Sequence, residues 1–128
     1  MTKIYVASKT HHADRWKEAR NYYNIISTWI DEAGPNQTKS LQELWIRILN
    51  EIKECDILVF YLESSNELLK GAFVEAGMAI ALNKKVRVIL GPSIDLDANF
   101  RPVGSWVNHP NVTLYTTFTK AFSGLERQ

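Results

Sequence analysis

The sequence predicts an α/β domain in which helices cover both faces of a parallel sheet. Short apolar runs rich in β-branched residues alternate with longer segments of helical periodicity, which is the pattern of parallel strands joined by crossover helices. The chain has 128 residues, 45% of them hydrophobic, which is ordinary globular composition and the usual size of one domain. We therefore expect residues 1–128 to form a single domain around one core.

The first half of the chain is expected to supply three strands and two helices. The strands are apolar runs, and the helices repeat apolar residues at helical spacing. The second helix follows a Gly-Pro-Asn turn at 34–36 and has Ser40 as its N-cap, with Glu43 three residues later in a capping-box pattern. In order, these elements are a strand at 3–7, a helix at 13–23, a strand at 24–30, a helix at 41–54 and a strand at 56–62.

The second half is expected to supply two strands and two helices. The first of these helices carries a stripe of small residues, including Ala72, Ala76 and Ala79, that lets it lie close to the sheet. Residues 93–111 show the weakest pattern and are interpreted as a long loop with one helical turn at most. In order, the elements are a helix at 71–83, a strand at 85–90, an edge strand at 112–115 and a helix at 119–125.

Five strands joined in this way predict a flavodoxin-like, doubly wound sheet of order 2-1-3-4-5 in three layers. Ligands of such sheets bind beyond the carboxyl ends of the strands where the strand order reverses, which here means the exits of the first and third strands. The first exit is a polar loop with Ser8, Lys9 and Thr10, where a following helix favours an anion. A dinucleotide or Walker-type phosphate loop is disfavoured, because the chain contains neither glycine-rich fingerprint.

Glu75 and Tyr5 are the candidate reactive pair. On a helix Glu75 shares a face with Gly71 and Met78, so its carboxylate is expected against small and apolar neighbours. Such a carboxylate has a raised pKa and must be hydrogen-bonded or take part in chemistry. Tyr5, in the middle of the first strand, is its natural hydrogen-bond partner. The alternative is a satisfied or partly exposed glutamate and a core tyrosine bonded to a backbone carbonyl.

Composition excludes several other classes of function. A net charge of +1 argues against a nucleic acid polymer or an anionic membrane as partner. The single cysteine, Cys55, allows no internal disulfide and has no partners at metal-ligand spacing, which favours the cytoplasm. The adjacent His11 and His12 are interpreted as surface residues, because neighbouring side chains on a helix diverge. We expect no targeting segment, no metal and no cofactor.

Four stretches resemble the nucleoside 2-deoxyribosyltransferase-like family. They are KIYVAS at 3–8, LNEIKECDILV at 49–59, GAFVEAGMA at 71–79 and KKV at 84–86, and their order and spacing match across most of the chain. The shared features are a tyrosine in the first strand, an acid opening the third, and a helix of the form G-x-x-x-E-x-G-x-A. The resemblance implies a flavodoxin-like fold and cleavage or transfer at the N-glycosidic bond of a (deoxy)nucleoside or its 5′-monophosphate.

The resemblance also implies roles for individual residues. Glu75 matches the nucleophile that attacks the anomeric C1′, and Tyr5 matches the tyrosine that positions it. A late-loop asparagine near the pair Ser105-Trp106 reaches the nucleoside in some relatives, often in a neighbouring subunit. The implied substrate contacts are Ala7, Ser8, Lys9, Thr10, Ser64, Gly71, Met78 and Asn99.

The chain departs from the family pattern at two positions. Ile48 and Leu69 stand where relatives carry acids that hold the sugar hydroxyls or assist the departing base. Glu63, Glu67, Asp95 or Asp97 would replace those acids only if a loop folded inward. These departures motivate a second hypothesis, a catalytically silent module that binds a nucleotide-derived ligand.

Two further hypotheses share the same fold. One is NAD glycohydrolase chemistry of the TIR type, which also places a helix glutamate beside such a sheet. The other, a flavin-binding electron carrier, is disfavoured because no loop after the third strand is suited to stacking on the flavin ring.

The tryptophan content predicts an oligomer. Four tryptophans, at 16, 29, 45 and 106, are many for the core of a monomer of this size, and aromatic residues are favoured at interfaces. We expect a homodimer or a larger homo-oligomer acting on a small molecule, with core packing of the tryptophans as the alternative.

Overall fold

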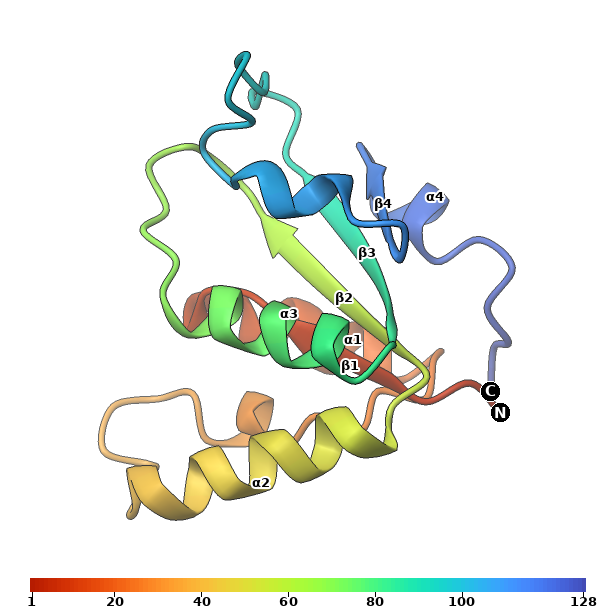
Figure 1. Ribbon diagram of the computed structural model, residues 1–128. Coiled ribbons are helices and arrows are strands. Elements are labelled where there is room, and N and C mark those ends of the chain that lie inside the picture. Colours follow the sequence, from red (N-terminus) through yellow and green to blue (C-terminus); the bar gives the residue numbers. More distant parts are fainter.

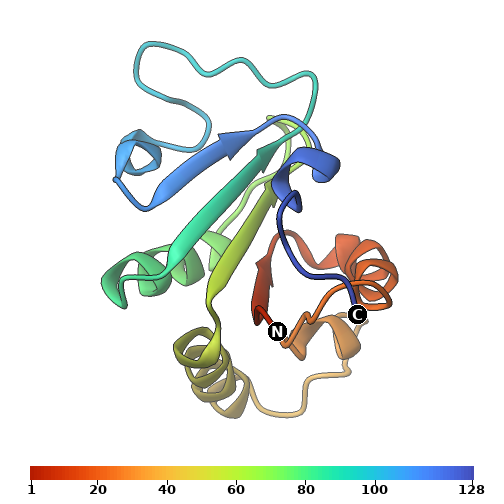
Figure 2. The same cartoon turned by 90° about the vertical axis from the view of Figure 1, so that its right-hand side faces the viewer.

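The computed structural model describes residues 1–128 and shows a four-stranded parallel sheet flanked by helices (Figure 1). The strands are β1 (Ile4–Ala7), β2 (Ile57–Leu62), β3 (Lys85–Leu90) and β4 (Val112–Tyr115), hydrogen-bonded in that order (Figure 2). The α-helices are α1 (Ala13–Arg20), α2 (Leu41–Glu54), α3 (Gly71–Ala81) and α4 (Phe118–Ala121). Short 3-10 helices occur at Thr10–His12, Trp29–Asp31 and Ser105–Asn108.

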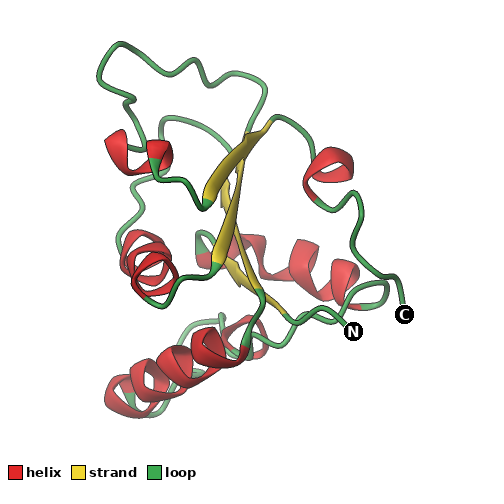
Figure 3. Cartoon of the chain, turned by 45° about the vertical axis from the view of Figure 1, so that its right-hand side comes forward, coloured by secondary structure: helices red, strands yellow, loops and turns green.

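The helices form two layers, one on each face of the sheet. Figure 3 shows α2 and α3 on one face and α1 and α4 on the other. Every residue of β1 and β2 is buried. β2 is an interior strand covered on both faces, whereas β1 is an edge strand whose free edge is covered by the segment 24–30. A single cluster of 30 buried residues forms the core. The α/β class and the three-layer arrangement are therefore as the sequence predicts.

The expected strand at 24–30 is wrong, and the sheet has four strands instead of five. Only Ile25 pairs with β1, through one parallel bridge to Ile4. Beyond it, side chains satisfy the edge of β1: the Val6 N–H donates to Ser27 Oγ (3.1 Å), and Trp29 Nε1 donates to the Val6 carbonyl (2.7 Å). The apolar pattern of this segment therefore reflects burial against the edge of the sheet, without a backbone ladder.

The helices begin as expected, except that α4 begins one residue early, and several end early. Ser40 caps α2, because its Oγ accepts a hydrogen bond from the Glu43 N–H (3.2 Å). α3 ends at Ala81 instead of residue 83, since Asn83 adopts a left-handed φ of 58° that terminates a helix. No helix is both long enough and apolar enough to span a membrane.

The ends of β2 and β3 approach each other closely at Gly91. The Gly91 N–H donates to the Leu62 carbonyl (2.8 Å), and a Cβ at position 91 would lie 1.9 Å from the carbonyl oxygen of Glu63. Only glycine fits there. This contact fixes the start of the loop that leads from β2 to α3, the element that carries Glu75.

Candidate active site

A cavity of about 300 Å³ lies at the carboxyl edge of the sheet, between the loop after β1, α2 and the start of α3. Its location matches the first-strand exit that the sequence predicts as a ligand site. The polar and charged part of its lining consists of Ser8, Lys9, Thr10, Lys70 and Glu75, together with Gly71. The apolar part consists of Trp29, Leu44, Trp45, Ile48, Leu69 and Ala72.

Glu75 presents one carboxylate oxygen to this cavity and keeps the other bonded. Its side chain is buried on α3, with only 6% of the residue exposed. The hydroxyl of Tyr5, itself fully buried in β1, donates to Oε1 of Glu75, which is the hydrogen bond that the sequence predicts. The second oxygen, Oε2, faces Gly71, where a Cβ would lie 3.9 Å from it. The absence of a side chain at Gly71 thus leaves Oε2 approachable.

Burial sets the protonation states of the pair. It raises the pKa of Glu75 from 4.5 to about 7; the Tyr5 hydrogen bond opposes the rise and the negative charge of Glu51 adds to it. The pKa of Tyr5 is raised well above its ordinary value, first by burial and then by the charge of Glu75. Tyr5 therefore remains a protonated donor, while Glu75 changes its charge near neutral pH.

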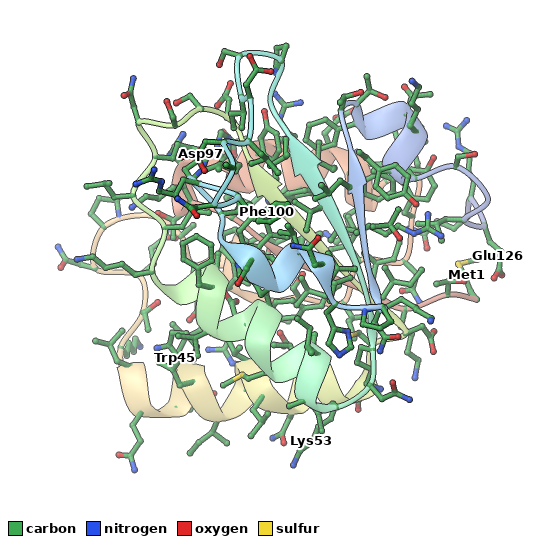
Figure 4. The ribbon with its side chains drawn as sticks, turned by 45° about the horizontal axis from the view of Figure 1, so that its top comes forward. Met1, Trp45, Lys53, Asp97, Phe100 and Glu126 are labelled. Atoms are coloured by element: carbon green, nitrogen blue, oxygen red, sulfur yellow. The ribbon has the colours of Figure 1, made fainter.

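The apolar wall of the cavity offers flat aromatic surfaces. Trp45 projects from α2 toward the first turn of α3 (Figure 4), and its ring would lie 3.4 Å from a Cβ at Gly71. Trp29 is held in place by its hydrogen bond to Val6. Faces of this kind suit a planar heteroaromatic ring. Ile48 and Leu69 lie in the same wall, so the two positions where relatives carry acids are apolar parts of the cavity.

The comparisons with known proteins give structural neighbours alone. No family model matches the sequence, and no curated protein matches it. A 2-deoxyribosyltransferase from Leishmania mexicana superposes with a TM-score of 0.67 at 17% identity, covering 95% of each chain. A CMP N-glycosidase from Clostridium botulinum superposes with a TM-score of 0.59 at 18% identity, covering 91% of this chain and 88% of the neighbour.

The chain has the fold of these two enzymes. Both neighbours are consistent with the nucleoside 2-deoxyribosyltransferase-like family, and the α/β fold with its parallel sheet is compatible with the flavodoxin-like fold that the resemblance implies, although the sheet has four strands instead of five. At these identities the likeness concerns the path of the chain and not the roles of individual residues.

The structure brings five of the predicted site residues to the cavity wall: Ser8, Lys9, Thr10, Gly71 and Glu75. Tyr5 lies behind Glu75, and Ala7 is buried at the end of β1. Ser64 lies in the turn after β2, where its carbonyl accepts a bond from the Glu67 N–H (3.1 Å), and the half-buried Met78 lies one turn beyond Glu75. Neither Ser64 nor Met78 lines the cavity.

Asn99 lies outside the cavity as well. It is exposed in the late loop, and Figure 4 shows Asp97 and Phe100 of this loop well apart from Trp45. Trp106 anchors the loop elsewhere, because its ring packs edge-on against Phe73 of α3 with centroids 6.2 Å apart. A contact of Asn99 with a ligand in the same chain would need this loop to move.

Sequence reasoning did not assign Leu44 or Trp45 to the site. Lys70 belongs to the loop at 64–71 before the helix, which the family resemblance implies as a substrate contact, and it does line the cavity. Leu44 and Trp45 belong to the buried side of α2, and only the packing of α2 against α3 makes them part of the cavity.

All four tryptophans are packed within the chain. Trp16 is fully buried and donates from Nε1 to Ser8 Oγ (2.8 Å), Trp29 is buried, and Trp45 and Trp106 are half-buried. Core and cavity packing account for them, so they do not argue for an interface between subunits. Homo-oligomerisation stays a prediction.

The interpretation of the adjacent histidines as surface residues is correct for His11 and wrong for His12. His12 is only 6% exposed, whereas His11 is exposed. They lie on a 3-10 turn with their ring centroids 4.0 Å apart, and both reach Glu67. Glu63 and Glu67 are thereby directed toward the histidines and do not take the place of the acids missing from the cavity.

Proposed function

We propose that the protein cleaves or transfers at the N-glycosidic bond of a nucleoside 5′-monophosphate or nucleoside, with Glu75 as the nucleophile. The observation that carries this proposal is the buried Glu75 carboxylate: one of its oxygens accepts a hydrogen bond from Tyr5, and the other faces a cavity lined by two lysines and two tryptophans. The shared fold of an N-glycosidase and a deoxyribosyltransferase supports the same class of reaction.

The chemistry follows the logic of a retaining glycosidase. Oε2 of Glu75 forms a bond to C1′ while the bond from C1′ to the base nitrogen breaks, and the electron pair leaves with the base, which gains a proton. Water, or a second base in a transferase, then attacks C1′ and releases the carboxylate. Tyr5 is a positioning residue, because its hydroxyl fixes the carboxylate and does not itself face the cavity.

Different residues of the cavity lining suit the phosphate and the base of such a substrate. Lys9 and Lys70 supply two positive charges on the polar side, where they complement a 5′-phosphate. Trp29 and Trp45 supply aromatic faces for the base. Since Ile48 and Leu69 replace the acids that hold sugar hydroxyls in relatives, we expect the phosphate and the base to contribute most of the recognition.

The proposal is tested with a panel of nucleosides, 2′-deoxynucleosides and their 5′-monophosphates, with chromatography for released base. We expect release from at least one monophosphate, faster than from the matching nucleoside. Glu75→Gln keeps the shape and the hydrogen bond but removes the nucleophile, and should reduce turnover by roughly 10⁴-fold. Glu18→Gln, at an exposed position on α1, is the matched control and should leave turnover unchanged.

Absence of base release from every member of the panel, or full activity in Glu75→Gln, would contradict the proposal. The apolar Ile48 and Leu69 favour one other candidate, a ligand-binding module without activity. That candidate predicts a rise in melting temperature with a nucleotide and no release of base.

A further inference from the structure

A second polar cluster lies outside the cavity, where the loop after β1 meets the loop after β2. It consists of His11, His12, Glu63 and Glu67, whose candidate ligand atoms all lie within 4.8 Å of one another. We propose that this cluster binds one divalent transition-metal ion, with Zn²⁺ the best fit, through one nitrogen from each histidine and one oxygen from each glutamate. This proposal does not rest on the proposed function.

The distances suit a tetrahedral metal. Ligands bound to Zn²⁺ at their usual lengths lie about 3.3 Å from one another. His12 Nε2 lies 3.3 Å from Glu63 Oε2, and His11 Nε2 lies 3.2 Å from Glu67 Oε2. The shorter distance of 2.7 Å between His12 Nε2 and Glu67 Oε2 is that of a hydrogen bond, which a metal would replace. Two imidazoles also favour Zn²⁺ over Mg²⁺ and Ca²⁺, which take oxygen ligands.

Two of the four ligands are fixed by their surroundings. Oε1 of Glu67 accepts a hydrogen bond from the Glu63 N–H (2.7 Å), which leaves Oε2 directed at the histidines. The buried ring of His12 packs edge-on against Tyr61, with centroids 4.9 Å apart. Contacts of this kind orient metal ligands and raise their affinity. Glu67 and His12 are thus preorganised as two of the four proposed ligands.

The other two proposed ligands, His11 and Glu63, are accessible to solvent, and the two glutamates supply negative charge. The side chains of His11 and Glu63 are 63% and 48% exposed, so an ion can enter from solvent and both groups can adjust. Neither glutamate forms an ion pair with a lysine or arginine; their partners are the histidines. With neutral imidazoles the cluster carries the two negative charges that a divalent cation balances.

A bound ion would join two loops that are far apart in the sequence. His12 and Glu67 are 55 positions apart, and each loop continues directly into the cavity lining, through Thr10 on one side and Leu69 on the other. The metal would therefore act as a cross-link beside the cavity.

The test is calorimetric titration of Zn²⁺ into the chelator-treated protein at about pH 7.5. We expect one ion per chain with a Kd of about 1 µM or tighter. Glu67→Gln and the exposed His11→Asn should each weaken binding by about tenfold or more. His109→Asn is the matched control, because His109 is the remaining histidine and lies outside the cluster.

Co²⁺ provides a second readout, since a tetrahedral nitrogen and oxygen site gives it intense visible absorption that Zn²⁺ abolishes by displacement. The proposal is overturned if the wild-type chain takes up no stoichiometric Zn²⁺. It is equally overturned if His11→Asn and Glu67→Gln bind as tightly as the wild type, or if His109→Asn weakens binding as much as they do.

Discussion

Glu75 and Glu67 lie near the same edge of the sheet and are both largely shielded from water, yet their surroundings differ. Glu67 has both oxygens engaged, Oε1 by a backbone N–H and Oε2 by imidazole nitrogens. In Glu75, Oε1 accepts a hydrogen bond from the Tyr5 hydroxyl, and Oε2 faces the space that is open because Gly71 has no side chain. The comparison teaches that two shielded carboxylates can differ in what they offer to a ligand: Glu75 leaves one oxygen without a hydrogen-bond partner beside a cavity, as the proposed nucleophile requires, whereas both oxygens of Glu67 have partners.

The largest expected effect is on the pH dependence of the free energy of unfolding, because burying the charged form of Glu75 costs stability. Its pKa is about 7 in the folded protein and 4.5 in the unfolded chain, so the folded state binds more protons between these values. Stability therefore falls as pH rises through this window, by about 3 kcal/mol in total. Glu75→Gln has no carboxylate at this position and should not lose stability in this way. The difference in the free energy of unfolding between Glu75→Gln and the wild type, measured by urea unfolding, should therefore change by about 3 kcal/mol in favour of the variant from pH 4 to pH 8.5.

A constant difference in the free energy of unfolding between wild type and Glu75→Gln across this pH range would contradict the prediction that the buried Glu75 charge costs stability. Glu18→Gln serves as control, because an exposed glutamate should add no comparable pH dependence.

Glu67→Ala should act in the opposite direction. It removes the hydrogen bonds to the Glu63 N–H and to His12, and with a chelator present it should lower the free energy of unfolding by about 2 kcal/mol. Urea unfolding measures this against Glu18→Ala as an exposed control. A stabilising Glu67→Ala would mean that the burial of its charge costs more than its hydrogen bonds contribute, as the burial of charged Glu75 costs stability.

Tyr5→Phe is expected to have the smallest effect on stability and an informative effect on pH dependence. It removes one hydrogen bond, worth about 1 kcal/mol. Because that bond lowers the pKa of Glu75, its loss should move the acidic limb of the kcat/KM profile to higher pH. Tyr115→Phe, in a half-buried tyrosine on β4, should leave the limb in place. An unchanged limb in Tyr5→Phe would remove Tyr5 from its positioning role.

Local pattern was sufficient for most of the fold. The apolar runs of the central strands and the Ser40 cap appear where the sequence indicates. The segment 24–30 was mispredicted because its apolar residues are buried for another reason: Ser27 and Trp29 bond the edge of β1 through their side chains. A hydrogen bond from a side chain leaves no mark in the periodicity of a sequence.

Part of the candidate site could also be predicted from the sequence, and part could not. The pairing of Tyr5 with Glu75 was predictable, because a mid-strand phenol and a carboxylate on the buried face of a helix both require polar partners. Trp45 was not, since it joins the cavity only through the packing of α2 against α3. The cluster of His12 with Glu67 was hidden because its members come from two loops 55 positions apart.

The distribution of indole rings has a practical consequence for spectroscopy. Trp29 and Trp45 line the cavity, whereas Trp16 is sealed in the core and Trp106 packs beside Phe73. Intrinsic fluorescence therefore contains two emitters that sense an occupant of the cavity and two that provide a steady background. The chain carries its own optical reporter of occupancy, which needs no attached dye.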